Sequence, residues 1–169
     1  SVVMDPADPA AALRFLGAGK HRGKVLLDMA REVPVAAPAF VTSGTHIVTG
    51  GLGGFGLELV QWLFERGAQR VVATSRSGIT TDWQRMRTAH FARVGWNLEV
   101  RSDDVCDPGQ CAALVRHADQ GIPLVGVWHL AMVLVDGLLA TMTDAQWDIA
   151  NAIKQDGAHN LDAATRGLP

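Results

Sequence analysis

The feature that most constrains the fold is a glycine-rich run, His46–Gly56, which reads H-I-V-T-G-G-L-G-G-F-G. It contains a short apolar stretch and leads into an amphipathic helical pattern that begins at about Gly54. Three of its glycines, Gly51, Gly53 and Gly56, fit the pattern G-x-G-x-x-G. Such glycines permit a tight turn, let backbone amides approach a phosphate, and let a helix pack closely on a strand. The run therefore predicts a strand, a phosphate-binding loop and a helix whose positive N-terminal end faces an anion.

Length and composition narrow the class of protein. The sequence of 169 residues is long enough to bury one core and to leave a smaller piece beside it. A net charge of −2 gives no electrostatic reason to expect a nucleic acid or an anionic membrane as partner. The sequence has no apolar run of membrane-spanning length and no secretory signal pattern. The two cysteines, Cys106 and Cys111, are expected to be reduced thiols, which indicates a cytoplasmic protein. No metal site is expected.

The chain divides into three segments. Residues 1–30 suggest a helix at about Ala7–Leu16 and a strand at Lys24–Met29, too little to bury a core, so they are interpreted as the tail of a preceding domain. Residues 31–43 carry two prolines and no clear period, which is typical of a linker. Residues 44–169 alternate between strand and helix patterns.

The third segment predicts a parallel α/β sheet. Strands are expected around Ile47 and Val48, and at Arg70–Ser75, Asn97–Ser102 and Leu124–Leu130. Helices are expected at Gly54–Arg66 with Gly67 as its stop, after a Thr81/Gln84 capping box to Val94, from Asp107-Pro108 to Gln120, and after a Thr143/Gln146 capping box to Arg166. The last strand is nearly all apolar, which predicts cover on both faces. The alternation indicates a doubly wound Rossmann sheet with about four strands instead of the usual six.

The residues that follow the second expected strand are Ser75-Arg76-Ser77. Sites selective for NADH usually place an acid here, which accepts hydrogen bonds from the ribose hydroxyls. An arginine instead offers a planar cationic fork to a 2′-phosphate. Arg76 therefore predicts NADPH, with a solvated surface arginine as the alternative.

Two acids follow the third expected strand. The Asp104 carboxylate can accept a hydrogen bond from an adenine amino group while Val105 packs on the ring. The adjacent Asp103 leaves open which of the two acids reaches the ligand, and an acidic loop without a ligand remains an alternative.

The fourth expected strand ends at His129-Leu130-Ala131. Small apolar residues at this edge would let a flat nicotinamide approach the backbone. We interpret His129 as a buried histidine satisfied by the backbone and not as a catalytic group.

A lysine in the last expected helix is a candidate catalytic residue. One inward-facing stripe is predicted by residues that recur at helical spacing: Trp147, Asn151 or Ala150, Lys154, Gly157 or Ala158, and Leu161. An ammonium on that stripe would lie beside the cofactor, where it could bind a ribose hydroxyl and lower the pKa of a neighbouring phenol. The alternative is a lysine whose stem covers apolar surface.

These motifs together resemble a known family. The matching stretches are Thr49–Gly56, Ser75–Gly78, His129–Ala131 with Leu134–Gly137, and Lys154 to Gly157 with Asn160-Leu161. They are similar to ketoreductase domains of animal-type fatty acid synthases and modular polyketide synthases, which are relatives of short-chain dehydrogenases, and look closest to the fatty acid synthase branch. Residues Leu13–Leu27 resemble the last helix and strand of an enoyl reductase, the domain that precedes the ketoreductase in these synthases.

The resemblance implies a reaction and its residues. NADPH would deliver hydride to the β-carbonyl of an acyl chain on acyl carrier protein, with the other synthase domains as further partners. Lys154 would be catalytic and would also bind the cofactor. The other implied cofactor-binding residues are Thr49, Gly51, Leu52, Gly53, Gly54, Phe55, Gly56, Ser75, Arg76, Ser77, Asp104, Val105, Leu130 and Ala131.

The family's serine, tyrosine and asparagine would follow Pro169, and the 169 residues contain no tyrosine. The expectation is therefore the cofactor-binding half of a site, inactive and poorly stable by itself. Two alternatives remain open. A non-catalytic pseudo-reductase scaffold would generally lose the glycine pattern, and a methyltransferase would favour an acid over Arg76.

Overall fold

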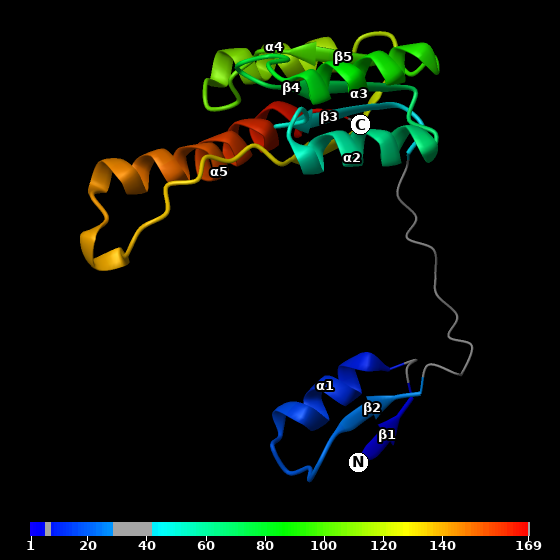
Figure 1. Ribbon diagram of the computed structural model, residues 1–169, viewed down its shortest axis with the longest axis vertical. Helices are drawn as coiled ribbons and strands as arrows, with labels where there is room; N and C mark the ends of the chain where they lie inside the picture. The colour runs from blue at the N-terminus through cyan, green and yellow to red at the C-terminus, as the bar shows by residue number, and fades with distance from the viewer. Residues whose placement is uncertain (6–7, 29–41, 169) are drawn as a thin grey trace. The chain divides into compact units, whose positions relative to one another are not determined.

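The computed structural model places the chain in two compact units, Ser1–Phe40 and Val41–Pro169 (Figure 1). The described residues are 1–5, 8–28 and 42–168. Nearly all of the predicted linker, and the ends of the predicted helix at Ala7 and strand at Met29, therefore lie outside the described residues.

The first unit is a small parallel β-α-β arrangement. Strand β1 (Val2–Met4) pairs with strand β2 (Val25–Leu27), and helix α1 (Pro9–Gly17) lies between them in the chain. The Asp8 carboxylate accepts a hydrogen bond from the amide of Ala11 at 2.8 Å and caps α1. Among the described residues of this unit only Ala12 is a buried apolar side chain, so the unit has almost no core. The sequence did not predict β1, because three residues carry too little periodicity.

The second unit contains a four-stranded sheet and four α-helices. Its elements are β3 (Thr45–Thr49), α2 (Gly54–Glu65), β4 (Arg70–Thr74), α3 (Asp82–Arg93), β5 (Leu98–Arg101), α4 (Pro108–Ala118), β6 (Leu124–His129), the 3-10 turn η1 (Leu139–Thr141) and α5 (Asp144–Thr165). All strand pairs are parallel, in the order β5-β4-β3-β6. The chain thus moves outward from β3 to β5 and then crosses back to the other side of β3. This is the doubly wound topology that the sequence predicted.

The predicted helix boundaries hold to within two residues. Capping boxes are present at Thr81 with Gln84 and at Thr143 with Gln146. The Asp107 carboxylate accepts from the amide of Gln110 at the start of α4. Past the end of α2, Gly67 has a φ of 101°, a conformation that favours glycine.

Two apolar layers cover the two faces of the sheet. Val48 and Val71 point to the layer formed with α2 and α3, whereas Ile47 and Val72 point to the layer formed with α4 and α5. This alternation follows from the two-residue side-chain period of a strand. The buried side chains of the two layers come from Leu57, Val60, Leu63, Phe64 and Phe91 on one side and from Cys111, Leu114, Val115, Ala118 and Leu161 on the other.

Strand β6 differs from its prediction. Its apolar sequence predicted burial on both faces, yet all six residues from Leu124 to His129 are only partly buried. Within the described part of the chain β6 pairs with β3 alone and forms one edge of the sheet. Its two faces do contact the two layers, because Trp128 packs against one and Val127 against the other. The partial exposure follows from the position of β6 at the edge of the sheet.

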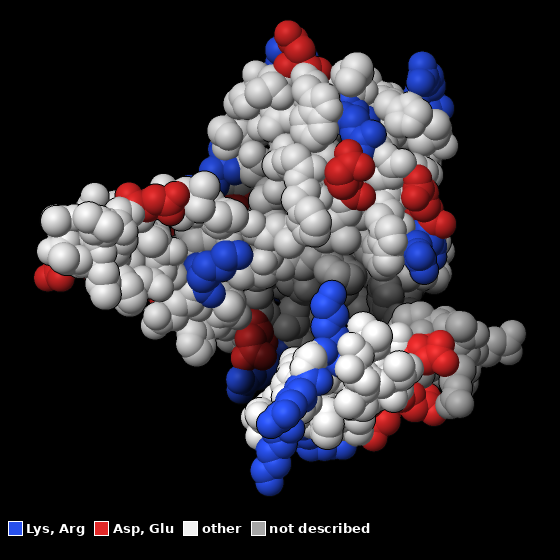
Figure 2. Space-filling view, turned by 60° about the horizontal axis from the view of Figure 1, so that its bottom comes forward, with Lys and Arg blue, Asp and Glu red and all other residues white. Residues whose placement is uncertain are grey.

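The surface of the second unit carries both charge signs. Acidic and basic side chains are interspersed on the face seen in Figure 2. No helix within the described ranges is long and apolar enough to cross a bilayer.

A buried histidine ties β3 to its surroundings. His46 has no exposed surface, and its Nε2 lies 2.8 Å from the carbonyl oxygen of Thr42. The indole nitrogen of Trp128 donates to Nδ1 at 3.2 Å. Since a carbonyl only accepts and an indole N–H only donates, Nε2 carries the hydrogen and the ring is neutral. Burial accordingly lowers the pKa of His46 below its usual value.

We predict that His46 makes folding sensitive to mild acid. Below pH 6.5, its ordinary pKa, the unfolded chain takes up a proton that the folded state resists. The free energy of unfolding should therefore fall as pH drops from 7 to 5, by at most about 1.4 kcal/mol per pH unit from this residue. Urea unfolding across this range should show a shallower dependence of the unfolding free energy on pH for His46→Gln than for the wild type. Equal slopes in the two proteins would contradict the prediction.

Candidate functional site

The carboxyl ends of the parallel strands meet at one edge of the sheet. The register pairs Thr49 of β3 with Thr74 of β4 and with His129 of β6. The chain leaves β3 and β6 toward different faces of the sheet here, and open α/β sheets bind ligands at such a switch point. Two pockets at this edge share Gly50, Ser75 and Met132, and we call them together the edge groove. Its other lining residues are Leu52, Gly53, Gly54, Phe55, Gly56, Thr74, Arg76, Ser77, Gln84, Asp103, Asp104, Val105, Leu130, Ala131, Ile153 and Lys154.

At several positions of the glycine-rich loop there is no space for a side chain. A Cβ on Gly51 would lie 2.7 Å from the Cβ of Ala73 in β4, and one on Gly56 would lie 2.6 Å from the carbonyl oxygen of Gly50. The left-handed residue of the turn is Gly50, with a φ of 66°. The sequence had assigned the tight turn to the G-x-G-x-x-G glycines, but Gly51 instead serves the close approach to β4.

Helix α2 begins at this loop without a side-chain cap. Its N-cap is Gly53, which offers no hydrogen-bonding side chain. The other four α-helices of the described chain all have an Asp or Thr cap that accepts a backbone hydrogen bond. Gly53, Gly54 and Phe55 are exposed on the groove. The first amides of α2 are therefore available to an anion, as the sequence predicted.

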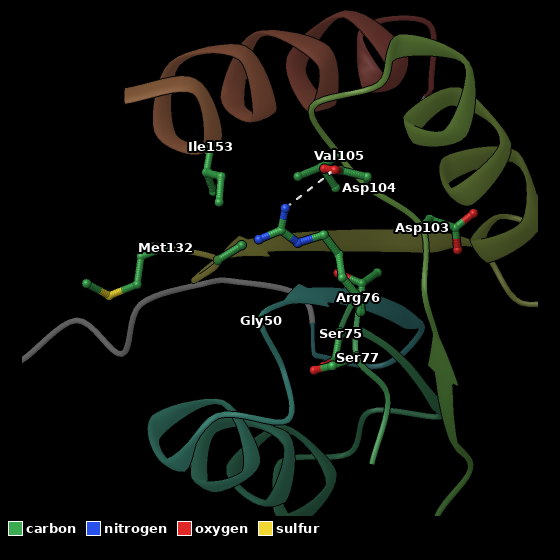
Figure 3. A pocket seen from close by; sticks show the side chains of 11 residues that line it. Gly50, Ser75, Arg76, Ser77, Asp103, Asp104, Val105, Met132 and Ile153 are labelled. Atoms are coloured by element: carbon green, nitrogen blue, oxygen red, sulfur yellow. Dashed lines mark ion pairs between the residues drawn. The ribbon is translucent and has the colours of Figure 1, made fainter. Parts of the chain in front are cut away.

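An arginine and an aspartate face each other across the groove. Arg76 follows β4, and its Nη1 lies 3.7 Å from Oδ2 of Asp104, which follows β5. Figure 3 shows the guanidinium reaching across the end of the sheet toward Asp104, below Ile153 of α5. The Arg76 side chain is 59% exposed, so it can turn toward a ligand at little cost.

The structure distinguishes the two adjacent acids that the sequence left open. The Asp103 carboxylate accepts two hydrogen bonds from Arg101, at 2.6 and 3.1 Å, and its side chain is only 11% exposed. In Figure 3 it points away from Arg76, whereas Asp104 points toward it. Asp104 is therefore the carboxylate available to a ligand.

Other predicted residues line the groove with less freedom. The Ser75 hydroxyl donates to the carbonyl of Gly78 at 3.3 Å, and Ser77 is exposed. Val105 is only 4% exposed and packs within the α4 and α5 layer, so little of it is open to a ring. Leu130 and Ala131 lie at the end of β6, half-buried.

Thr49, which is buried, and His129, which is partly buried, are hydrogen-bonded to each other beside the groove. The Thr49 hydroxyl accepts from the amide of Ala131 at 3.1 Å and lies 2.7 Å from Nδ1 of His129. His129 Nε2 lies 2.9 Å from the carbonyl oxygen of Ile153 in α5. Nε2 must donate to that carbonyl, so the Thr49 hydroxyl donates to Nδ1. Burial, and then the charge of Lys154, lower the pKa of His129, so the neutral ring persists.

These contacts agree with the interpretation of His129 as a histidine satisfied by a backbone carbonyl, with a threonine hydroxyl as its second partner, although the residue is only partly buried. Thr49 has no exposed surface and does not line the edge groove, although the sequence predicted it as a cofactor-binding residue.

Lys154 reaches the groove from α5. Its Nζ lies 3.5 Å from the carbonyl oxygen of His129, and its side chain lines the same pocket as the glycine loop. The predicted stripe is confirmed at Gly157 and Leu161, which are buried. It is wrong at Trp147, which is 54% exposed, and it missed the buried Ile153. Trp147 lies in the first turns of α5, which extend past the sheet (Figure 1).

Sequence reasoning missed several groove residues. Gly50 could have been found from its place in the glycine run. Gln84 was read only as a capping residue, although its amide nitrogen also donates to the carbonyl of Leu52 at 3.0 Å. Met132 and Ile153 carry no local signal. No three His, Cys, Asp or Glu side chains of the described residues gather as a metal site.

Comparison with known families identifies the second unit. A family model described as the KR domain matches residues 44–169. The chain belongs to the KR domain family. The chain is thereby placed in an oxidoreductase family of the short-chain dehydrogenase type, whose members use nicotinamide cofactors.

The relatives of this KR domain chain include very large synthases. A hybrid PKS-NRPS synthetase, pyvA, of Aspergillus violaceofuscus is 36% identical over 174 residues, which cover 96% of this chain and 4% of that protein. A mycocerosic acid synthase-like polyketide synthase of Mycobacterium tuberculosis is 36% identical over 172 residues, which cover 96% of this chain and 8% of that protein. The chain thus spans less than a tenth of these two relatives.

Solved ketoreductases share the fold. An A1-type ketoreductase matches with a TM-score of 0.74 and 31% identity over 82% of this chain and 29% of that one. A-type ketoreductases from a modular polyketide synthase match with a TM-score of 0.74 and 27% identity over 98% of this chain and 39% of that one. The predicted ketoreductase of a synthase is confirmed at this level, while the fatty acid synthase branch and the enoyl reductase tail stay predictions.

The glycine loop gives a test by stability alone. Gly56→Ala in the KR domain should lower the free energy of unfolding by about 1–3 kcal/mol, because the new Cβ would meet backbone atoms that cannot move aside. Gly54→Ala is the matched control, since a Cβ there meets nothing within 4 Å and alanine favours a helix. Urea unfolding measures both variants. An equal loss at both positions would show that close packing does not explain Gly56.

Proposed function

We propose that this KR domain binds NADPH in the edge groove and takes part in the reduction of a β-ketoacyl thioester to a β-hydroxyacyl thioester. The observation that carries the proposal is the position of Arg76, which follows β4 in the same groove as the uncapped start of α2. The two features are suited to two different phosphates of one ligand. The alternative ligand, NADH, has no 2′-phosphate for the Arg76 guanidinium to bind.

The groove residues fit a dinucleotide on chemical grounds. The amides at the start of α2 suit the pyrophosphate, because glycines leave them uncovered. The Arg76 guanidinium suits the 2′-phosphate, and the Asp104 carboxylate suits an adenine amino group. Leu130 and Ala131 suit the flat nicotinamide. When bound, NADPH supplies the hydride.

Lys154 is the residue of this chain that we assign to the reaction. Its side chain is exposed in the groove. There it can donate a hydrogen bond to a ribose hydroxyl and lower the pKa of a nearby acidic hydroxyl. The 169 residues contain no tyrosine, so the group that protonates the carbonyl oxygen is not assigned among them.

We further propose the setting of this reaction. The substrate would be carried by acyl carrier protein within a cytoplasmic multifunctional synthase, and residues 1–30 would be the end of an enoyl reductase-like domain joined by the linker at 31–43. The large size of the relatives supports this setting. A structural role without catalysis is the alternative, and it requires a folded chain that binds no nicotinamide cofactor.

Cofactor titration tests the proposal. Tryptophan fluorescence of the 169-residue chain should report binding of NADPH in preference to NADH. Arg76→Ala should weaken NADPH binding by about 10- to 100-fold, since a hydrogen bond to a charged group contributes about 1.5–3 kcal/mol. NADH binding should hardly change. Arg116→Ala, which removes an exposed arginine of α4, is the control and should bind as the wild type does.

Three outcomes would argue against the proposal. Equal losses for both coenzymes in Arg76→Ala would remove the 2′-phosphate argument. A folded wild type that binds neither coenzyme would favour the structural role. Binding of S-adenosylmethionine in place of NADPH would favour a methyltransferase.

A further inference from the structure

The side chain of Gln84 joins two parts of the groove that are far apart in the sequence. Its Oε1 accepts hydrogen bonds from the backbone amides of Thr80, at 2.8 Å, and Thr81, at 3.0 Å. Its Nε2 donates to the carbonyl oxygen of Leu52, at 3.0 Å. Because backbone amides can only donate, the orientation of the side-chain amide is fixed by its partners.

The carbonyl that Gln84 holds lies in the middle of the glycine loop. Leu52 and Gly53 share one peptide unit, and the N–H of that unit donates to the carbonyl of Gly50 at 3.0 Å. The unit is therefore held at both ends, once from within the loop and once from α3. Gly53 is the N-cap of α2, so this peptide unit leads directly into the amides at the start of the helix.

The loop needs such a contact because its own residues restrict it so little. Five of the seven residues from Gly50 to Gly56 are glycines, and glycine loses more conformational freedom on ordering than any other residue. Leu52 is the larger anchor, with 2% of its surface exposed. A hydrogen bond to its carbonyl fixes the peptide plane, which packing of the side chain alone does not fix.

We infer that Gln84 is a positioning residue that holds the glycine loop in its ligand-binding shape, an inference that rests on the proposed function for its effect on affinity. The cap of α3 could be made equally by glutamate. Only the amide can also donate to a carbonyl, because an ionised carboxylate has no hydrogen to give. The contact to Leu52 thus explains why glutamine, and not glutamate, stands at this position.

Three variants of the full 169-residue chain separate the two roles of Gln84. Gln84→Glu keeps the acceptor for the cap and loses the donor to Leu52. Gln84→Ala loses both without adding charge. Thr81→Ala is the matched control, because it removes the hydroxyl that caps the amide of Gln84 and leaves the Leu52 contact in place.

Hydrogen exchange without cofactor provides the first measurement. The amides of Gly51 and Gly53 are hydrogen-bonded within the loop and to β4, so their exchange reports loop opening. We expect about 5- to 10-fold faster exchange at both amides in Gln84→Ala and Gln84→Glu, and no such change in Thr81→Ala. An equal change in Thr81→Ala and Gln84→Ala, or none in either Gln84 variant, would overturn the inference.

NADPH affinity provides the second measurement. Gln84→Ala should raise the dissociation constant about 5- to 10-fold, as expected for the loss of one hydrogen bond to a buried group, with Thr81→Ala close to wild type. The added charge of Gln84→Glu should weaken binding further at low salt, and 0.5 M salt should remove that part only. Wild-type affinity in Gln84→Ala would contradict the inference. If the wild type itself binds no NADPH, the proposed function fails, while the exchange experiment still tests the contact.

Discussion

The second unit depends on backbone approaching backbone at the carboxyl edge of its sheet. At Gly50, Gly51 and Gly56 even one added carbon would lie within 3 Å of atoms of Ala131 after β6, of Ala73 in β4 or of the loop itself. Close packing here keeps side chains out of the space in front of α2, so the helix begins with uncovered amides. These close contacts fix the positions of β3, β4, α2 and the end of β6 relative to one another. The positions of these elements in turn decide which residues face the groove.

A second constraint ties α5 to this edge. His129 is hydrogen-bonded to Thr49 on one side and to Ile153 on the other, and a Cβ on Gly157 would lie only 3.1 Å from the His129 ring. The absence of a side chain at Gly157 thus allows the ring to fit against the helix. Lys154, one turn earlier, is thereby directed into the groove although it does not belong to the buried face of α5. A neutral histidine serves this purpose because each ring nitrogen has a partner of the right kind.

Local chemistry made much of the fold predictable from the sequence. The capping boxes, Asp107 and Gly67 each act through atoms within a few residues of themselves, so their effect can be read in the chain. The same holds for the glycine run and for the position of Arg76, because both directly follow a strand. Features decided by distant partners could not be read in this way. Examples are the partial exposure of β6, the rotation of α5 set by its contact with His129, the choice between Asp103 and Asp104 set by Arg101, and the second hydrogen bond of Gln84.

The pairing of Arg76 with Asp104 has a consequence for the lifetime of a complex. Both side chains are partly in water, and an ion pair of this kind contributes roughly 0–1 kcal/mol, so it separates easily. When a bound phosphate leaves, however, the Arg76 guanidinium can pair with Asp104 again. The carboxylate then compensates the charge of the guanidinium, which favours release of the ligand. If the groove binds NADPH as proposed, this counter-ion would shorten the time for which each coenzyme molecule stays bound, while the Arg76 guanidinium would still favour a coenzyme that carries a 2′-phosphate.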